Sequence, residues 1–94
     1  MSRYKVECVS LDYDSQYDDC RRVEEIGFRT ESGGITTRTP RQVYEMINQD
    51  GDTVLVEYRG DLTEVIGVTH GTTKYVRTES TDTEDDALLK KPSC

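Results

Sequence analysis

The sequence predicts an α+β fold, in which an antiparallel sheet of about five strands carries one packed helix, in the order β-β-α-β-β-β. Three observations favour this fold. Apolar and polar residues alternate over several short runs, as half-buried strands require. One segment near the middle of the chain combines a helix start with a helical apolar stripe. Short turns separate the runs that follow, which is typical of an antiparallel meander.

The first two predicted strands are joined by an aspartate-rich loop, whose charges oppose regular packing. Tyr4, Val6 and Cys8 alternate with polar residues and share one face of the first strand. In the second strand, the pair Glu24 and Glu25 indicates a bulge or an exposed start. The predicted elements before the helix are a strand at 3–11, the loop at 12–19, a strand at 20–30, a turn at 31–34 and a short extended link at 35–38.

The best local signal is a helix start at Thr39. Thr39 is a good N-cap, Pro40 suits the first helical position, and Gln42 stands where a capping box places Glu or Gln. Gly51 ends the helix, where a residue of positive φ is expected. The helix is about ten residues long, so it needs a sheet to pack against. Its apolar stripe consists of Val43, Met46 and Ile47.

Three further strands follow the helix, and the chain forms a single domain over residues 1–94. The acidic loop at 12–19 and the tail at 79–94 are expected to be partly flexible, with a small apolar anchor at 87–89. The predicted elements after the helix are a strand at 54–58, a turn at 59–61, a strand at 62–68, a turn at 70–72 and a strand at 73–78.

The charge of the chain argues against two classes of partner. Nineteen acidic and 12 basic residues give a formal net charge of −7. A negative surface repels phosphate groups and anionic membranes, so we expect no nucleic-acid and no membrane partner. The acid-rich and threonine-rich composition is similar to that of proteins from salt-loving organisms. No signal peptide follows Met1, which predicts a cytoplasmic protein. Nucleic-acid binding would have to be considered again if the fold brought four arginines into one surface patch. These arginines are Arg21, Arg22, Arg38 and Arg41.

The three cysteines are too few, and odd in number, for a disulfide scaffold, so reduced thiols are expected. Cys8 fits a small core residue, Cys94 a terminal thiol and His70 a turn residue. Cys20 would lie across from Cys8 if the first two strands formed a hairpin. Three thiolates and an imidazole suit zinc, but their spacing lacks a paired-cysteine knuckle, so no cofactor and no metal site are predicted.

No catalytic machinery is evident, and we expect a protein that is not an enzyme. Nucleophilic catalysis needs a nucleophile, a base and an orienting group, and nothing places a thiol beside the single histidine, His70. Glycine-rich phosphate loops and dinucleotide fingerprints do not occur. The acidic loop lacks the glycine and the terminal glutamate of a calcium-binding loop.

One cluster near the end of the last strand is a candidate contact for a partner or an anion: Tyr75, Arg77, Thr78 and Asp82. Tyr75 and Arg77 project from the same face by strand alternation. The simpler interpretation is that Arg77 pairs with Asp82 or another carboxylate and fixes the C-terminal segment on the sheet. A guanidinium fork in this position would also suit an anion or a partner carboxylate.

The C-terminal two thirds of the chain, from about Gly34 to Cys94, resembles an uncharacterised bacterial and archaeal family catalogued as domain of unknown function 3892. The family shows a glycine turn, a strand with a Tyr-x-Arg-Thr pattern, a downstream Asp, a Leu-Leu pair and a closing Pro-x-Cys. The resemblance implies a fold-level grouping and no established activity. The matching residues are Gly71, Tyr75, Arg77, Thr78, Asp82, Leu88, Leu89, Pro92 and Cys94.

The function that these patterns favour is a small non-catalytic domain that binds another protein through a sheet edge or through the sheet face opposite the helix. The alternative is a metal-binding or thiol-dependent protein that uses Cys8, Cys20, His70 and Cys94.

Overall fold

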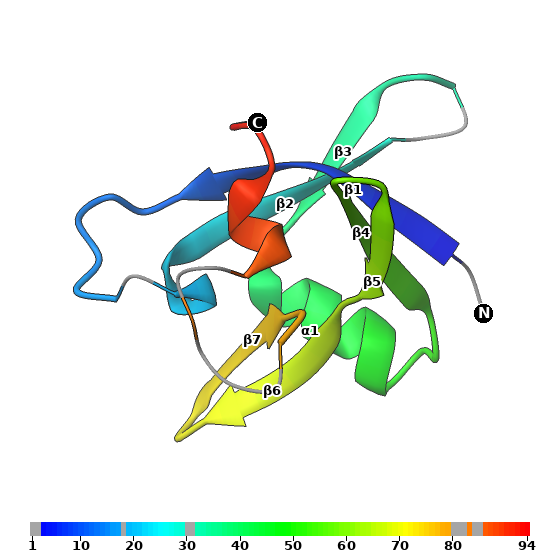
Figure 1. The fold of residues 1–94 in the computed structure, drawn as a ribbon. Helices are drawn as coiled ribbons and strands as arrows, with labels where there is room; N and C mark the ends of the chain where they lie inside the picture. The colour runs from blue at the N-terminus through cyan, green and yellow to red at the C-terminus, as the bar shows by residue number, and fades with distance from the viewer. Residues whose placement is uncertain (1–2, 18, 30–31, 80–82, 84–85) are drawn as a thin grey trace.

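The computed structural model describes residues 3–17, 19–29, 32–79, 83 and 86–94, and it has the α+β class that the sequence predicts. One α-helix and seven strands are present in the described part, with two short 3-10 helices (Figure 1). In chain order the elements are β1 (Arg3–Leu11), η1 (Cys20–Arg22), β2 (Val23–Arg29), β3 (Ile35–Arg38), α1 (Pro40–Asn48), β4 (Thr53–Tyr58), β5 (Asp61–Glu64), β6 (Ile66–His70), β7 (Thr73–Arg77) and η2 (Ala87–Lys90).

Five strands form the main sheet in the order β3-β2-β1-β4-β5, and β6 and β7 form a separate two-stranded sheet. The prediction of a wholly antiparallel sheet is wrong, because β1 and β4 are parallel. Antiparallel pairing of β1 with β2 and of β2 with β3 leaves β3 running in the same direction as β1. The helix then returns the chain to the far side of β1, so β4 also runs in that direction.

The predicted element order is also corrected, from β-β-α-β-β-β to β-β-β-α-β-β-β-β. The four residues at 35–38, expected to be a link, pair with β2 as strand β3. The single strand expected at 62–68 is divided at Val65 into β5 and β6. Val65 is fully buried, and its N–H donates to the Val54 carbonyl at 2.8 Å, so the chain turns inward there.

The bulge and the turn that the sequence predicts are both confirmed. Ser10 pairs with Glu25 and Leu11 with Val23, so Glu24 is an additional residue in β2. Between β4 and β5, Arg59 has φ 54° and Gly60 has φ 84°. Positive φ at both central residues is the conformation that two-residue hairpin turns favour.

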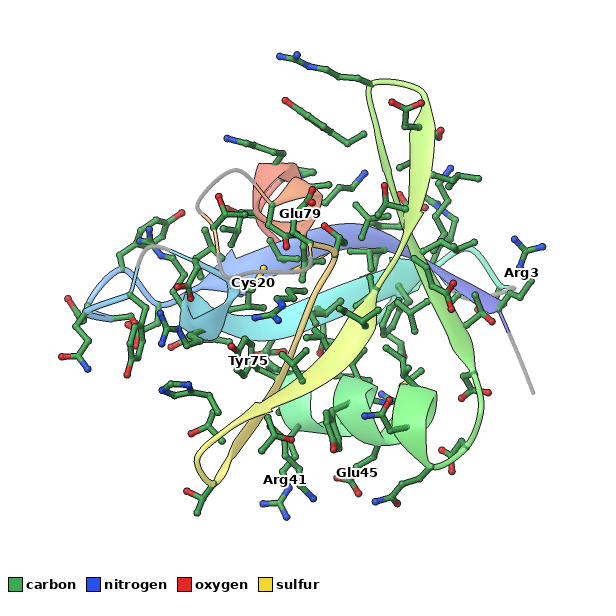
Figure 2. The ribbon with its side chains drawn as sticks, turned by 60° about the horizontal axis from the view of Figure 1, so that its bottom comes forward. Arg3, Cys20, Arg41, Glu45, Tyr75 and Glu79 are labelled. Atoms are coloured by element: carbon green, nitrogen blue, oxygen red, sulfur yellow. A yellow bond between two sulfur atoms is a disulfide. The ribbon has the colours of Figure 1, made fainter. Side chains whose placement is uncertain are left out.

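Both parts of the predicted capping box form at the start of α1. The Gln42 N–H donates to Thr39 Oγ1 at 3.2 Å, and the Thr39 N–H donates to Gln42 Oε1 at 2.9 Å. The predicted end is confirmed as well, with Gly51 at φ 73°. Helix α1 packs on the main sheet and on the β6–β7 hairpin, which lies along it (Figure 1). Figure 2 shows Arg41 and Glu45 on the outer side of this helix, pointing away from the sheet.

The core lies between the main sheet, α1, the β6–β7 hairpin and η2. The buried Val43 and the partly buried Met46 and Ile47 bring the predicted helix stripe into this core. Leu88 of η2 is fully buried in it, which anchors the C-terminal segment. The buried members of the core are Val6, Val9, Cys20, Val23, Ile26, Phe28, Val43, Val54, Val56, Val65, Tyr75, Val76 and Leu88.

Candidate functional site

The cluster predicted near the end of β7 divides between the core and the C-terminal segment. Tyr75 of β7 is 3% exposed and packs in the core (Figure 2). The Arg77 Nε donates to the backbone carbonyl of Glu79 at 3.0 Å. Asp82 lies outside the described residues. The structure therefore brings together Arg77 and Thr78 at the end of β7, with Tyr75 below the surface.

The carboxylate that fixes the C-terminal segment on the sheet is Asp86, which the sequence analysis missed. Its side chain is fully buried and accepts four hydrogen bonds. Thr78 donates from its N–H at 2.9 Å and from its hydroxyl at 2.6 Å, and Glu79 donates from its N–H at 3.2 Å. The Leu88 N–H donates at 3.0 Å, so Asp86 is also the N-cap of η2. An Asp directly before an apolar Ala-Leu-Leu run was the available signal for this cap.

The structure pairs two of the three cysteines. Cys8 of β1 and Cys94 form a disulfide, with their Cα atoms 4.9 Å apart and a separation of 86 positions in sequence. The expectation of reduced thiols is therefore wrong for these two residues. Cys20 is buried and is not part of a disulfide, and the residue across from Cys8 is Gly27, which corrects the expected position of Cys20. His70 ends β6 at the exposed tip of the hairpin.

The four residues considered for zinc do not gather in this structure. Within the described residues, no three His, Cys, Asp or Glu side chains form a group that could hold a metal ion. Two of the four ligands that the sequence offered, Cys8 and Cys94, are joined to each other. A disulfide has no thiolate to donate to a metal, so such a site would first require its reduction.

A small group of residues on the face opposite α1 surrounds this disulfide, and we call it the disulfide patch: Cys8, Gly27, Ile35 and Cys94. Ile26 and Phe28 face the core, so the intervening Gly27 faces outward. A Cβ atom at Gly27 would overlap the Cys8 sulfur, lie 2.9 Å from the Cys94 sulfur and lie 3.0 Å from Ile35 Cγ2. Glycine at this position is therefore what leaves room for the disulfide.

The last residues of the chain act as a short additional strand beside β1. The Val9 N–H donates to the Pro92 carbonyl at 2.9 Å, and the Cys94 N–H donates to the Val9 carbonyl at 3.3 Å. Val9 and Ser93 form an isolated parallel bridge. The C-terminal end of the chain, drawn in red, lies beside β1 in Figure 1. The C-terminal segment thus covers the part of β1 that β4, paired only at Arg3–Lys5, leaves open.

The exposed edges of the main sheet differ in charge. β3 has the sequence Ile-Thr-Thr-Arg, and its Ile35 is 48% exposed. β5 has the sequence Asp-Leu-Thr-Glu, and its Leu62 is 58% exposed. Charged residues on edge strands oppose pairing with other chains. The carboxylates at both ends of β5 therefore protect that edge, whereas the first three residues of β3 carry no charge.

An ion pair borders the disulfide patch on β1 and β2. The Arg29 Nε donates to Glu7 Oε1 at 3.1 Å, and this hydrogen bond lowers the pKa of Glu7. Arg29 is paired with Ile35 across β2 and β3. Both charged side chains remain partly exposed, so the pair contributes little to stability, and it neutralises the charge beside Ile35.

The acidic loop ends in a second ion pair, at η1. Arg21 donates from Nε and Nη2 to the two carboxylate oxygens of Asp19, at 2.9 and 2.6 Å. These hydrogen bonds lower the pKa of Asp19 against the opposing effect of burial. The Arg21 guanidinium also lies 3.9 Å from the Tyr17 ring centroid. This contact holds the end of the loop against η1.

The four arginines considered for nucleic-acid binding come from three different elements. Arg21 and Arg22 belong to η1, Arg38 ends β3 and Arg41 belongs to α1. Arg21 pairs with Asp19, and Arg41 lies 3.8 Å from a carboxylate oxygen of Glu45. Carboxylates thus neutralise two of the four charges.

Comparisons of the chain with models of protein families, with curated proteins and with solved structures gave no match. The resemblance to the family of domain of unknown function 3892 therefore stays a prediction. In the described part of the chain, no helix is long and apolar enough to cross a membrane.

Proposed function

We propose that this protein is a small non-catalytic interaction domain that binds an extended segment of a partner protein at the edge strand β3. The observation that carries the proposal is Ile35, a large apolar side chain that is 48% exposed on a strand with an open edge. An added strand gains main-chain hydrogen bonds from such an edge, and exposed side chains next to it provide specificity.

The disulfide patch favours β3 over β5, the other edge strand, as the site of partner binding. Ile35 stands beside the disulfide, so a bound segment could place an apolar side chain against both. The neighbouring charges of Arg29 and Glu7 are already paired, which lowers the cost of covering them. On β5, by contrast, a bound segment would remove water from the carboxylates of Asp61 and Glu64 at the two ends of the strand.

Replacing Ile35 with lysine is expected to weaken partner binding at least about tenfold, because the interface would have to desolvate an ammonium group. Since Ile35 is half exposed, the stability of the free domain should change by less than about 1 kcal/mol. The measurement is affinity capture from an extract of the source cells at native salt, followed by titration of the purified partner.

Leu62→Lys is the matched control, because Leu62 is the exposed apolar residue of the opposite edge strand. The partner should bind this variant as it binds the unmodified protein. Equal loss with both variants, loss with Leu62→Lys alone, or no partner captured by the unmodified protein would each count against binding at β3.

The alternative function was a metal-binding or thiol-dependent protein, and one observation favours the thiol-dependent form. Cys8 and Cys94, two of the four residues on which that alternative depends, lie in bonding contact. Reversible thiol chemistry at this pair is compatible with partner binding at β3, because it concerns the C-terminal segment and not the edge strand itself.

A further inference from the structure

The C-terminal segment has two parts that are attached to the domain in different ways. The first part is anchored from within, by the fully buried Leu88 and by the four hydrogen bonds to Asp86. The second part, residues 91–94, contributes no side chain to the buried core. Pro92, Ser93 and Cys94 are all exposed. The latter part therefore depends on a few surface contacts and on the disulfide.

Those surface contacts are weak compared with the covalent bond. Two backbone hydrogen bonds join residues 92 and 94 to Val9, at 2.9 and 3.3 Å. The Lys91 ammonium group donates to the Glu57 carbonyl at 3.3 Å. Each such bond adds little net stability in water, and freeing four terminal residues recovers conformational entropy that opposes it. Without the disulfide, the balance favours release of the segment.

We propose that the Cys8–Cys94 disulfide is a reversible redox latch, which a dithiol opens to release residues 91–94 from β1 while the rest of the domain stays folded. Cys94 is exposed at the end of the chain, whereas Cys8 is 8% exposed. We therefore expect an attacking thiolate to reach the sulfur of Cys94 rather than that of Cys8.

The thiol–disulfide exchange takes place in two steps. A thiolate of the dithiol attacks Cys94 Sγ, the bond between the two protein sulfurs breaks, and Cys8 leaves as a thiolate that takes up a proton. The second thiolate of the dithiol then attacks the other sulfur of the same dithiol, which is bonded to Cys94 in the mixed disulfide. This step releases Cys94 as a thiolate, which is protonated in turn. The protein disulfide gains two electrons and two protons, and the dithiol is oxidised to a cyclic disulfide.

Opening the latch changes the surface in two places. It frees the N–H and carbonyl of Val9, so an additional stretch of sheet edge on β1 becomes available to an extended segment. It also uncovers Gly27, next to Ile35, on the outer face of the sheet. The C-terminal segment thus occupies a site that accepts an extended chain, and the redox state of the pair controls whether that site is open.

The test is digestion of the full-length protein with carboxypeptidase, with and without dithiothreitol, followed by mass spectrometry of the intact chain. The oxidised protein is expected to keep its C-terminal residues. After reduction, Cys94 and Ser93 should be removed at least tenfold faster. Cys94→Ser should be digested at the fast rate without dithiothreitol, and Cys20→Ser, which alters the buried cysteine outside the disulfide, should behave as the unmodified protein.

Amide hydrogen exchange of the unmodified protein keeps the test informative if a variant fails to fold. Reduction should speed exchange of the Val9 amide at least tenfold more than that of the Val65 amide, which is bonded to Val54. Loss of the disulfide makes global unfolding easier for both amides, but it releases the C-terminal segment only from Val9. The proposal is overturned if dithiothreitol fails to reduce the folded protein, if residues 91–94 stay protected after reduction, or if reduction speeds exchange of the two amides equally. None of these readouts depends on a partner binding at β3.

Discussion

Replacing Asp86 with alanine is expected to lower the free energy of unfolding by about 3 to 5 kcal/mol. The carboxylate is fully buried and accepts hydrogen bonds from Thr78, Glu79 and Leu88. Alanine would leave three backbone N–H groups without an acceptor and would remove the N-cap of η2. A domain of this size has a total stability of about 5 to 15 kcal/mol, so the variant should approach the unfolding threshold. Urea denaturation, monitored by circular dichroism, measures the loss.

Two further variants separate the role of the carboxylate from that of a charge in general. Asp50→Ala removes an exposed carboxylate, so its free energy of unfolding should change by less than about 0.5 kcal/mol. Asp86→Asn keeps the size of the side chain, but its amide N–H₂ group would face backbone N–H donors whichever way it is turned. It should therefore be destabilised as well. Wild-type stability of either Asp86 variant would contradict the role assigned to this residue.

Replacing Gly27 with alanine is expected to destabilise the oxidised protein by about 2 kcal/mol, because the added methyl group would overpack a filled site. Its Cβ would overlap the Cys8 sulfur and crowd the Cys94 sulfur and Ile35 Cγ2. Reduction lets the Cys8 side chain rotate and lets Cys94 leave, so the reduced form should be affected less. The equilibrium between disulfide and dithiol should then shift toward the reduced form by up to about thirtyfold, measured by titration with dithiothreitol.

Gly67→Ala is the matched control for this shift. A Cβ at Gly67 would lie 2.9 Å from Tyr44 Cδ2 and 3.0 Å from Asn48 Nδ2, so this variant should also lose stability. Gly67 contacts α1 and not the disulfide, and its loss should be the same in both redox states. Identical redox titrations for the two glycine variants would mean that Gly27 does not make room for the disulfide.

The parts of the fold that the sequence predicts are those fixed by neighbouring residues. The capping box at Thr39 and the hairpin turn at Arg59–Gly60 involve residues no more than a few positions apart, and both are confirmed. The parallel pairing of β1 with β4 joins residues about fifty positions apart. The alternation of apolar and polar residues does not indicate whether a strand runs parallel or antiparallel to its neighbour. The division of one apolar run at Val65 was missed for a similar reason, since burial of that residue depends on its contact with β4.

The candidate site was less predictable, because its key contacts span the whole chain. Cys8 and Cys94 stand 86 residues apart, and spacing alone cannot pair cysteines. The outward face of Gly27 is evident only once its neighbours in β2 are known to face the core. Asp86 lies in an acidic stretch in which most carboxylates would be expected to face solvent. Its burial follows from its position between the end of β7 and η2.

The disulfide patch and the proposed release of the C-terminal segment both require the bond between Cys8 and Cys94. Unfolding the unreduced protein with an alkylating agent present, then cleaving before aspartates, separates the three cysteines onto different peptides: 1–11, 19–49 and 86–94. We predict that mass spectrometry will find peptide 1–11 linked to peptide 86–94 and Cys20 alkylated on peptide 19–49. Alkylated Cys8 and Cys94 in protein kept from reductants, or a link between Cys8 and Cys20, would contradict the pairing of Cys8 with Cys94.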